Sequence, residues 1–418
     1  MRILAARYPA RFANLPQIGT RLKIEMPEPG VEERAHSRRL AAAIAAEIAA
    51  HGPMPFARFM ERCLYAPGLG YYSAGRLKFG KQGDFVTAPE LGSLFASSVA
   101  RALAPALHAC GDDAVFFELG GGSGAFARDC MRALQALHAL PKHYWLLEPS
   151  ADLRERQRES LREALPGELF ARVQWLDRPP QTAWNGVLFA NEVLDALPVT
   201  RFRIGEGEVF EEHIALDADN AFIRVDQPAD ALVAGAVRHL QRKLGAPFAE
   251  DYRSEVLPQL PWWIEAIAGT LQRGAALFVD YGYPRREFYL PERRDGTLVC
   301  HYRHRAHGDA LWYPGLQDIT AFVDFTALIE AGIAAGFEPV AYASQAAFLM
   351  ASGLDIAFAQ AYGETRDEAA RYALAGEVKK LSLPGEMGER FQMMLFARDL
   401  DSENLFASLR AADRSERL

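Results

Sequence analysis

The sequence predicts an α/β protein built around a Rossmann-like, mainly parallel sheet, with an N-terminal helical segment and an α+β insertion after the fourth strand. An apolar run at 114–117 ends in Glu118 and a glycine cluster at 120–124. The residues that follow, 125–140, carry apolar side chains at helical spacing. A strand, a glycine turn and a helix in this order form the first βα unit of a doubly wound sheet.

The glycine cluster and the acid before it favour a nucleoside cofactor that carries a positive charge. Glycines let the backbone turn sharply, and the helix that follows offers free N–H groups to a ligand. Glu118 stands two residues before the first glycine, where its carboxylate could hold the ammonium group of S-adenosylmethionine. The same carboxylate would repel a pyrophosphate.

A second apolar run, 144–147, ends in Glu148, 24 residues after the last glycine of the cluster. An acid at this point is placed to accept hydrogen bonds from both ribose hydroxyls, in NAD as well as in S-adenosylmethionine. The cluster and the alanine at 125 also satisfy the dinucleotide pattern GxGxxA. NAD(P) therefore stays open as an alternative, and the acid before the cluster favours S-adenosylmethionine.

The composition limits the classes of protein that fit. The chain has 418 residues, of which 50% are hydrophobic and 24% charged, a balance typical of globular proteins. Its net charge of −8 argues against nucleic acid or an anionic membrane as the main partner. No run is long and apolar enough to span a bilayer. The four cysteines form no CxxC pair, which argues against structural zinc and favours a reducing compartment.

Residues 1–36 are predicted to be an extension with little order. The first 24 residues hold five basic residues and no acid, a feature of mitochondrial transit peptides. They contain no serine, however, and Pro9 and Pro16 would interrupt an amphipathic helix. The sequence therefore favours a bacterial cytoplasmic protein, with the mitochondrial matrix as the alternative.

Residues 37–110 are predicted to form N-terminal helices and a loop that covers the cofactor. One helix begins at Ser37 and ends at 52–53, and a second carries apolar residues over 56–64. The segment 78–90 is polar and rich in glycine, and long loops of this kind are uncommon unless they bind a ligand. A plain surface connection is the alternative.

The third and fourth strands are predicted at 173–177 and 186–190. The third would form the edge of an adenine pocket, and the fourth is fully apolar, as buried parallel strands are. The fourth strand delivers the segment 191–198 at its carboxyl end, where ligands bind in open α/β sheets. The acids there could also simply cap a helix. Residues 199–265 contain alternating apolar positions and predict a small insertion on the substrate side.

The remaining elements complete the predicted core, which comprises 111–198 and 266–400. A fifth strand is predicted at 275–282 and a helix at 325–336. Two closing strands, 339–343 and 391–397, are separated by helices at 345–380. Residues 401–418 form a C-terminal tail.

The histidine spacing in the loop 301–309 raises the hypothesis of a metal site. Histidines at 301, 304 and 307 stand near an acid and could ligate zinc. Arginines lie between them, however, and would repel a cation. The loop is therefore predicted to be a basic surface or substrate loop, and no metal site is predicted.

A series of motifs follows one another between about residues 37 and 398. The motifs are Gly83–Glu90, Glu118–Leu119–Gly120–x–Gly122–x–Gly124, Glu148–Pro149–Ser150, Asn191–Glu192–x–x–Asp195–Ala196–Leu197–Pro198, Asp280–Tyr281–Gly282, Pro314–Phe325 and Met387–Phe391. Together they resemble those of the MidA-like methyltransferases. The resemblance implies a class I methyltransferase that uses S-adenosylmethionine and leaves S-adenosylhomocysteine.

The MidA-like family is similar to the mitochondrial complex I assembly factor that methylates an arginine of a complex I subunit. The resemblance therefore implies a protein substrate, with a respiratory complex subunit as a candidate. One departure is present in the glycine turn: where the family usually has proline and arginine, this chain has Gly121 and Ser123. The residues present still allow the glycine turn, and therefore cofactor binding, whereas a contact made by that arginine side chain is lost.

These observations define a candidate site. Methyl transfer depends mainly on positioning the nucleophile, and carboxylates can hold a guanidinium in bidentate pairs. Glu192 and Asp195 are the predicted catalytic residues. The predicted cofactor-binding residues are Phe85, Thr87, Pro89, Glu118, Gly120, Gly121, Gly122, Gly124, Glu148, Pro149, Ser150, Leu176, Asp177 and Asn191.

Two alternatives stay open beside arginine methylation. The chain could be a pseudo-enzyme or assembly scaffold that binds S-adenosylmethionine without turnover. It could also be a small-molecule O-methyltransferase, which would want a base such as His304 near the methyl group.

Overall fold

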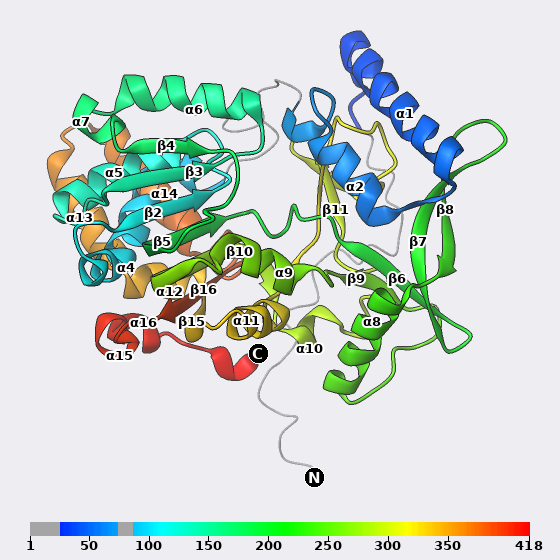
Figure 1. Cartoon of the computed structure of the whole chain (residues 1–418). Helices are drawn as coiled ribbons and strands as arrows, with labels where there is room; N and C mark the ends of the chain where they lie inside the picture. The colour runs from blue at the N-terminus through cyan, green and yellow to red at the C-terminus, as the bar shows by residue number, and fades with distance from the viewer. Residues whose placement is uncertain (1–25, 74–86) are drawn as a thin grey trace.

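The computed structural model describes residues 26–73 and 87–418. Two sheets with their own helices lie beside one another in Figure 1, a main sheet on the left and a smaller antiparallel sheet on the right. The N-terminal extension up to residue 25, and the part of the predicted covering loop that falls in 74–86, lie outside the described residues.

The main sheet has the strand order β15-β16-β10-β5-β2-β3-β4, and β14 (Val323–Asp324) pairs with β10. Its parallel strands are β2 (Val115–Leu119), β3 (His143–Leu147), β4 (Val173–Leu176), β5 (Trp184–Asn191) and β10 (Leu271–Tyr283). At one edge, β16 (Phe391–Arg398) runs antiparallel to β10, and β15 (Glu338–Ser344) runs antiparallel to β16. The predicted α/β class is confirmed, with the predicted strands in place.

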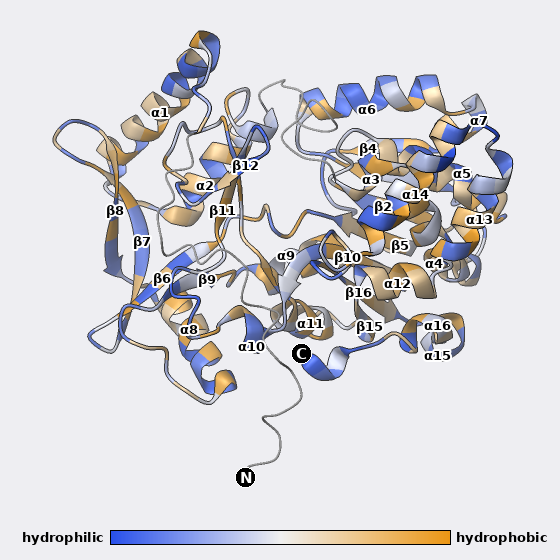
Figure 2. Cartoon of the chain, turned by 180° about the vertical axis from the view of Figure 1, so that it is seen from behind, coloured by the Kyte–Doolittle hydropathy of each residue, from blue (hydrophilic) through white to orange (hydrophobic). Residues whose placement is uncertain are grey.

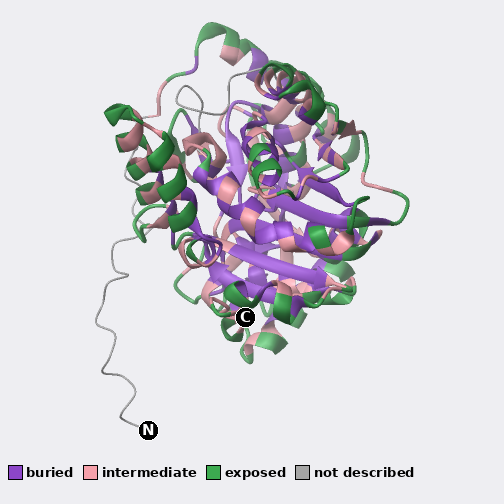
Figure 3. Ribbon diagram, turned by 90° about the vertical axis from the view of Figure 1, so that its left-hand side faces the viewer, coloured by how far each residue is buried: buried purple, intermediate pink, exposed green. Residues whose placement is uncertain are grey.

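Helices cover both faces of this sheet, which explains why its strands are apolar on both sides. One face packs against α4 (Leu94–Cys110), α5 (Ala125–Ala136), α6 (Ala151–Ala164), α7 (Gly167–Phe170), α12 (Gln345–Ala351), α13 (Leu354–Glu364) and α14 (Glu368–Ser382). The other face packs against α9 (Leu260–Ala268) and α11 (Phe325–Ala334). The strands are buried in Figure 3, and α6 is mostly hydrophilic in Figure 2, as its outer position requires.

The second sheet is antiparallel, with the order β1-β7-β6-β9 and β8 paired to β7. Its strands are β1 (Met54–Pro55), β6 (Thr200–Gly205), β7 (Glu208–Leu216), β8 (Phe222–Pro228) and β9 (Arg253–Val256). The helices α1 (Val31–His51) and α2 (Phe56–Tyr65) share one apolar cluster with it, and α8 (Ala231–Leu244) shares another. Alternating apolar positions in 199–225 thus do form antiparallel strands.

A third, three-stranded sheet joins this part of the molecule and has the order β12-β11-β13. Its strands are β11 (Val299–Tyr302), β12 (Arg305–His307) and β13 (Asp318–Thr320). Cys300 and Ile319 from this sheet are buried in the same cluster as α1 and α2. Residues 299–320 were predicted in the core with the main sheet, but they pack with the N-terminal helices instead.

Three further boundaries differ from the prediction. The first helix begins at Val31 rather than Ser37, because Glu33 accepts a hydrogen bond from the Gly30 N–H and so closes the helix start. The helix α9 lies partly inside the predicted insertion 199–265, yet it packs on the main sheet. The C-terminal tail contains α15 (Ser402–Leu405) and α16 (Ala407–Arg410), and both Phe406 and Leu409 are buried.

Short elements complete the described chain: η1 (Tyr71–Ser73), α3 (Ala88–Leu91), α10 (Arg285–Phe288) and η2 (Ser415–Arg417). Over residues 26–73 and 87–418, no helix has the length and hydropathy that crossing a membrane requires.

Candidate active site

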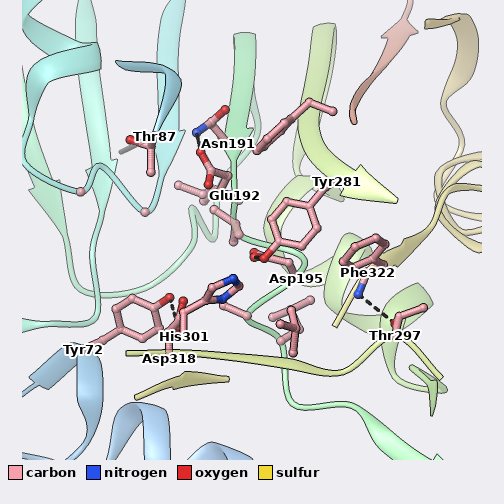
Figure 4. Close-up of a pocket in the computed structure, with 18 of the residues that line it drawn as sticks. Tyr72, Thr87, Asn191, Glu192, Asp195, Tyr281, Thr297, His301, Asp318 and Phe322 are labelled. Atoms are coloured by element: carbon pink, nitrogen blue, oxygen red, sulfur yellow. Dashed lines mark hydrogen bonds between the residues drawn. The ribbon is translucent and has the colours of Figure 1, made fainter. Parts of the chain in front are cut away.

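A pocket lies between the carboxyl ends of the main-sheet strands and the N-terminal helical part of the molecule. The main sheet contributes residues from β2, β3, β5 and β10, and the opposite side contributes residues from α2, β11 and β13. Figure 4 shows side chains from both sides pointing into this space. Open α/β sheets bind ligands at this edge, so the pocket stands where the sequence placed the site.

The glycine turn forms one wall of the pocket, and two of its positions have a backbone conformation that favours glycine. Gly120 and Gly122 have φ of 64° and 52°, the left-handed region. A Cβ on Gly121 would lie 2.7 Å from the Leu146 side chain. The turn is also tied down by Gln157, whose Nε2 donates to the Gly122 carbonyl at 3.0 Å. Gly120, Gly121 and Gly122 line the pocket, whereas Gly124 is the N-cap of α5 and lies outside the lining.

Glu118 lies at the end of β2 beneath this turn and is buried. The Tyr144 hydroxyl donates to its Oε2 at 2.7 Å. The pKa of Glu118 is raised to about 8: burial is the largest cause, the hydrogen bond from Tyr144 opposes the rise, and the nearby Glu148 contributes to it. A cation placed against this carboxyl would favour its ionised form, so the residue fits an ammonium group.

Glu148 follows β3 and accepts hydrogen bonds from donors in the segment that follows it. The Ser150 N–H donates to its Oε1 at 2.9 Å, and Gln157 Nε2 donates to its Oε2 at 3.3 Å. Ser150 also caps α6, because its hydroxyl accepts from the Leu153 N–H. The strand end, the cap and the carboxylate therefore form one rigid unit that fits ribose hydroxyls. Glu148, Pro149 and Ser150 all line the pocket.

Some predicted cofactor residues are placed elsewhere. Leu176 and Asp177 are not among the lining residues; the Asp177 side chain is 86% exposed and pairs with Arg154 at 2.7 Å. Phe85 lies outside the described residues, whereas Thr87 and Pro89 line the pocket.

Asn191 ends β5 and points into the pocket (Figure 4). Its Nδ2 donates to Glu192 Oε1 at 3.1 Å. Its Oδ1 is buried and has no hydrogen-bond partner among the residues that the structure describes. A buried acceptor without a donor is costly, so this oxygen fits a ligand that brings an N–H or O–H group.

Glu192 follows in a left-handed conformation, with φ of 53°, which is uncommon for any residue except glycine. The turn aims its side chain into the pocket (Figure 4). Burial raises the pKa of Glu192 to about 8, and the charges of Asp195 and Asp318 add to this rise. Three acids therefore share one electrostatic environment.

Asp195 is buried and lines the same pocket. The Tyr281 hydroxyl donates to its Oδ2, while its Oδ1 has no hydrogen-bond partner within residues 26–73 and 87–418. Burial raises the pKa of Asp195 to about 6. The hypothesis that this acid caps a helix does not fit, because its carboxylate faces the pocket.

Asp280 holds the backbone of the segment that carries Asp195. Its Oδ2 accepts from the Leu194 N–H at 3.0 Å and the Asp195 N–H at 3.2 Å, and its Oδ1 accepts from the Tyr281 N–H. The motif Asp280–Tyr281–Gly282 was visible in the sequence, but the role of its acid was not. It fixes the turn that carries Asp195.

The opposite wall contains residues that the sequence did not single out for the site. Tyr65 and Tyr72 stack with ring centroids 5.5 Å apart, and the Tyr72 hydroxyl donates to Asp318 Oδ1 at 2.9 Å. His301 also lines the pocket, and burial lowers its pKa to about 4. His304 is exposed and outside the lining. Among the described residues, no group of three His, Cys, Asp or Glu side chains could hold a metal ion.

The chain matches a family model described as "Putative S-adenosyl-L-methionine-dependent methyltransferase" over residues 98–343. The chain belongs to this family. The MidA-like resemblance is thereby confirmed, and the protein is an S-adenosylmethionine-dependent methyltransferase. The choice of S-adenosylmethionine over NAD(P) is confirmed as well.

Solved structures and curated relatives agree with this assignment. A protein from Burkholderia thailandensis, crystallised with S-adenosyl-homocysteine, is 42% identical to this chain with a TM-score of 0.84, covering 94% of this chain and 100% of the other. The mitochondrial protein arginine methyltransferase NDUFAF7 of Homo sapiens is 29% identical, over 82% of this chain and 80% of the relative. The Bos taurus protein of the same name is 28% identical, over 83% and 81%.

Proposed function

We propose that this methyltransferase transfers a methyl group to a guanidinium nitrogen of an arginine side chain in a protein substrate. The observation that carries the proposal is the acidic end of the pocket, where Glu192 and Asp195 face the same space. A cationic acceptor suits such a site better than an anionic or apolar one. The curated relatives named protein arginine methyltransferases support the same choice.

We further infer how the chain would hold its cofactor. S-adenosylmethionine supplies an electrophilic methyl group on a sulfonium. Glu118 would pair with its ammonium, the Asn191 Oδ1 would accept a hydrogen bond at the methionine end, and Glu148 would accept from the ribose hydroxyls. The turn at 120–122 lets the backbone approach closely. Thr87 and Pro89 would cover the methionine end.

At the acceptor end, the two carboxylates hold the guanidinium in line and then help to remove a proton. Bidentate pairing with Glu192 and Asp195 fixes the plane of the guanidinium, which is the main catalytic requirement. The methylated nitrogen must lose one proton. A carboxylate whose pKa burial has raised is a suitable acceptor for it, and Glu192 Oε2 or Asp195 Oδ1 can take this role.

The experiment uses S-adenosylmethionine labelled in its methyl group, the purified protein and a bacterial lysate. We expect label in protein, and methylated arginine after hydrolysis. Label in lysine or in the small-molecule fraction would refute the proposal. Tight S-adenosylhomocysteine binding with no label transfer would favour the pseudo-enzyme instead. Respiratory complex subunits are the first candidates to examine, on the strength of the family resemblance.

The O-methyltransferase alternative has less support. O-methylation requires a base beside the methyl group. His304, the residue considered for that role, is exposed and does not line the pocket. His301 does line the pocket, but the carboxylates around the same space favour a cation.

A further inference from the structure

The pocket has a second wall, opposite the acids that follow β5. This wall is formed by Tyr65 from α2, Tyr72 from η1, and Asp318 from β13. None of them belongs to the main sheet, and Tyr72 and Asp318 are 246 positions apart in the sequence. The acceptor end is therefore closed by residues from the N-terminal helical part and the third sheet.

Asp318 is directed into the pocket by strand pairing. Its register partner in the antiparallel ladder between β13 and β11 is His301, and residues opposite each other point to the same face. Both line the pocket, as Figure 4 shows. Asp318 and Glu192 line the same pocket, and the charge of Asp318 contributes to the raised pKa of Glu192.

Tyr72 fixes the orientation of Asp318. Its hydroxyl donates to Asp318 Oδ1 at 2.9 Å, and its ring stacks on Tyr65 at an interplanar angle of 21°. Tyr65 in turn donates to the Ala196 carbonyl at 2.9 Å, within the segment that carries Glu192 and Asp195. This chain of contacts links the two walls and sets the distance between them.

The two walls match the shape and chemistry of a guanidinium. This group is flat, stacks on aromatic faces and presents N–H donors along more than one edge, whereas a lysine ammonium is a compact point charge. Acids on one side can satisfy one edge, and a further acid beside aromatic rings can satisfy another.

We propose that Asp318, oriented by Tyr72, binds the edge of the acceptor guanidinium that faces away from Glu192 and Asp195, and thereby selects arginine over lysine. The inference rests on the proposed function and names a further binding residue, Asp318, and a positioning residue, Tyr72. A guanidinium held from two walls cannot rotate, so one nitrogen stays aligned for transfer.

The test uses probes that do not depend on knowing the protein substrate. Each probe is an adenosine whose 5′-thioether carries a three-carbon chain ending in guanidine, amine or methyl. We expect wild-type protein to bind the guanidine probe at least 10-fold more tightly than the other two. Asp318→Asn should reduce this preference by about 10-fold, since it removes a charge-assisted hydrogen bond, and Tyr72→Phe should reduce it by less.

Binding of S-adenosylhomocysteine is measured beside each probe, because it reports folding and cofactor affinity. The affinity for S-adenosylhomocysteine should be unchanged in both variants. If Asp318→Asn no longer binds S-adenosylhomocysteine, the guanidine preference of Tyr72→Phe becomes the test of the proposal. The matched controls are Asp355→Asn and Tyr372→Phe, both exposed on the far helices α13 and α14. A guanidine preference that persists in both pocket variants would overturn the role of Asp318 and leave the arginine proposal intact. No guanidine preference in the wild type would overturn the arginine proposal itself.

Discussion

Replacing Glu192 with Gln should distinguish the binding of the cofactor from the binding of the methyl acceptor, because we expect it to weaken only the second. The amide keeps the size of the side chain and can still accept the hydrogen bond from Asn191 Nδ2, so the left-handed turn should persist. Only the charge is lost. A hydrogen bond to a charged group contributes ~1.5–3 kcal/mol and a neutral one ~0.5–1.5 kcal/mol. The difference of ~1–1.5 kcal/mol predicts a loss of about 5–12-fold in kcat/KM for the acceptor.

The pH dependence sharpens this prediction. Burial raises the pKa of Glu192 to about 8 and that of Asp195 to about 6, and a cationic acceptor needs both groups ionised. Because kcat/KM reports the ionisation of the free enzyme, it should rise with pH through about 6 and level off above about 8. Glu192→Gln should remove the upper part of this rise and leave the lower part.

The assay is initial-rate methyl transfer to the acceptor identified by labelling, from pH 5.5 to 9, with S-adenosylhomocysteine affinity measured by calorimetry on the same samples. Glu206→Gln is a suitable control, because Glu206 also has a left-handed φ of 54° but is exposed outside the pocket. Unchanged transfer and an unchanged pH profile in Glu192→Gln would refute the role of this carboxylate. A parallel loss of cofactor affinity would show that it acts on the cofactor side.

Three further outcomes are expected. Glu148→Ala should weaken S-adenosylhomocysteine binding by ~1.5–3 kcal/mol in calorimetry, through the loss of charge-assisted hydrogen bonds, whereas the exposed Glu163→Ala should leave it unchanged. Because burial raises the pKa of Glu118 to about 8, binding at pH 7 should release a proton, detectable as a dependence of the calorimetric enthalpy on buffer, and Glu118→Gln should abolish it. Arg201→Met should lower the free energy of unfolding by ~3–5 kcal/mol in chemical denaturation, because it leaves the buried Glu255 without its cation; an unchanged midpoint would contradict this.

The parts of the site that the sequence predicted share a local signal. Glu118, Glu148 and Asn191 each follow a short apolar run, and such runs become parallel strands whose carboxyl ends meet at one edge. A parallel strand that is buried on both faces has a nearly continuous apolar run, which marks it in the sequence. The central strands and their following turns could therefore be predicted from the residues alone.

The opposite wall had no such signal. Asp318 and Tyr72 meet only because β13 pairs with β11 and that sheet packs near η1, and no local pattern records contacts of this kind. The same limit explains the helix α9, which was placed partly in the predicted insertion although it packs on the main sheet. Asp177 shows the reverse error: it follows a strand as Glu148 does, yet its side chain pairs with Arg154 outside the pocket.

The density of acids in the pocket follows from the charges that must meet there. Methylation of an arginine brings a guanidinium against a sulfonium, and two positive charges 4 Å apart repel by ~1 kcal/mol in water and by ~4 kcal/mol at the effective dielectric near a protein surface. Glu192 and Asp195 offset this repulsion from one side. Burial raises the pKa of both acids, so in the protein alone each keeps its neutral form to a higher pH than a free carboxyl does, and the stability that the neutral group contributes is lost as pH rises through that pKa. A bound cation reverses this preference. The acids that disfavour the folded state at high pH are thus the groups that let two cations approach each other.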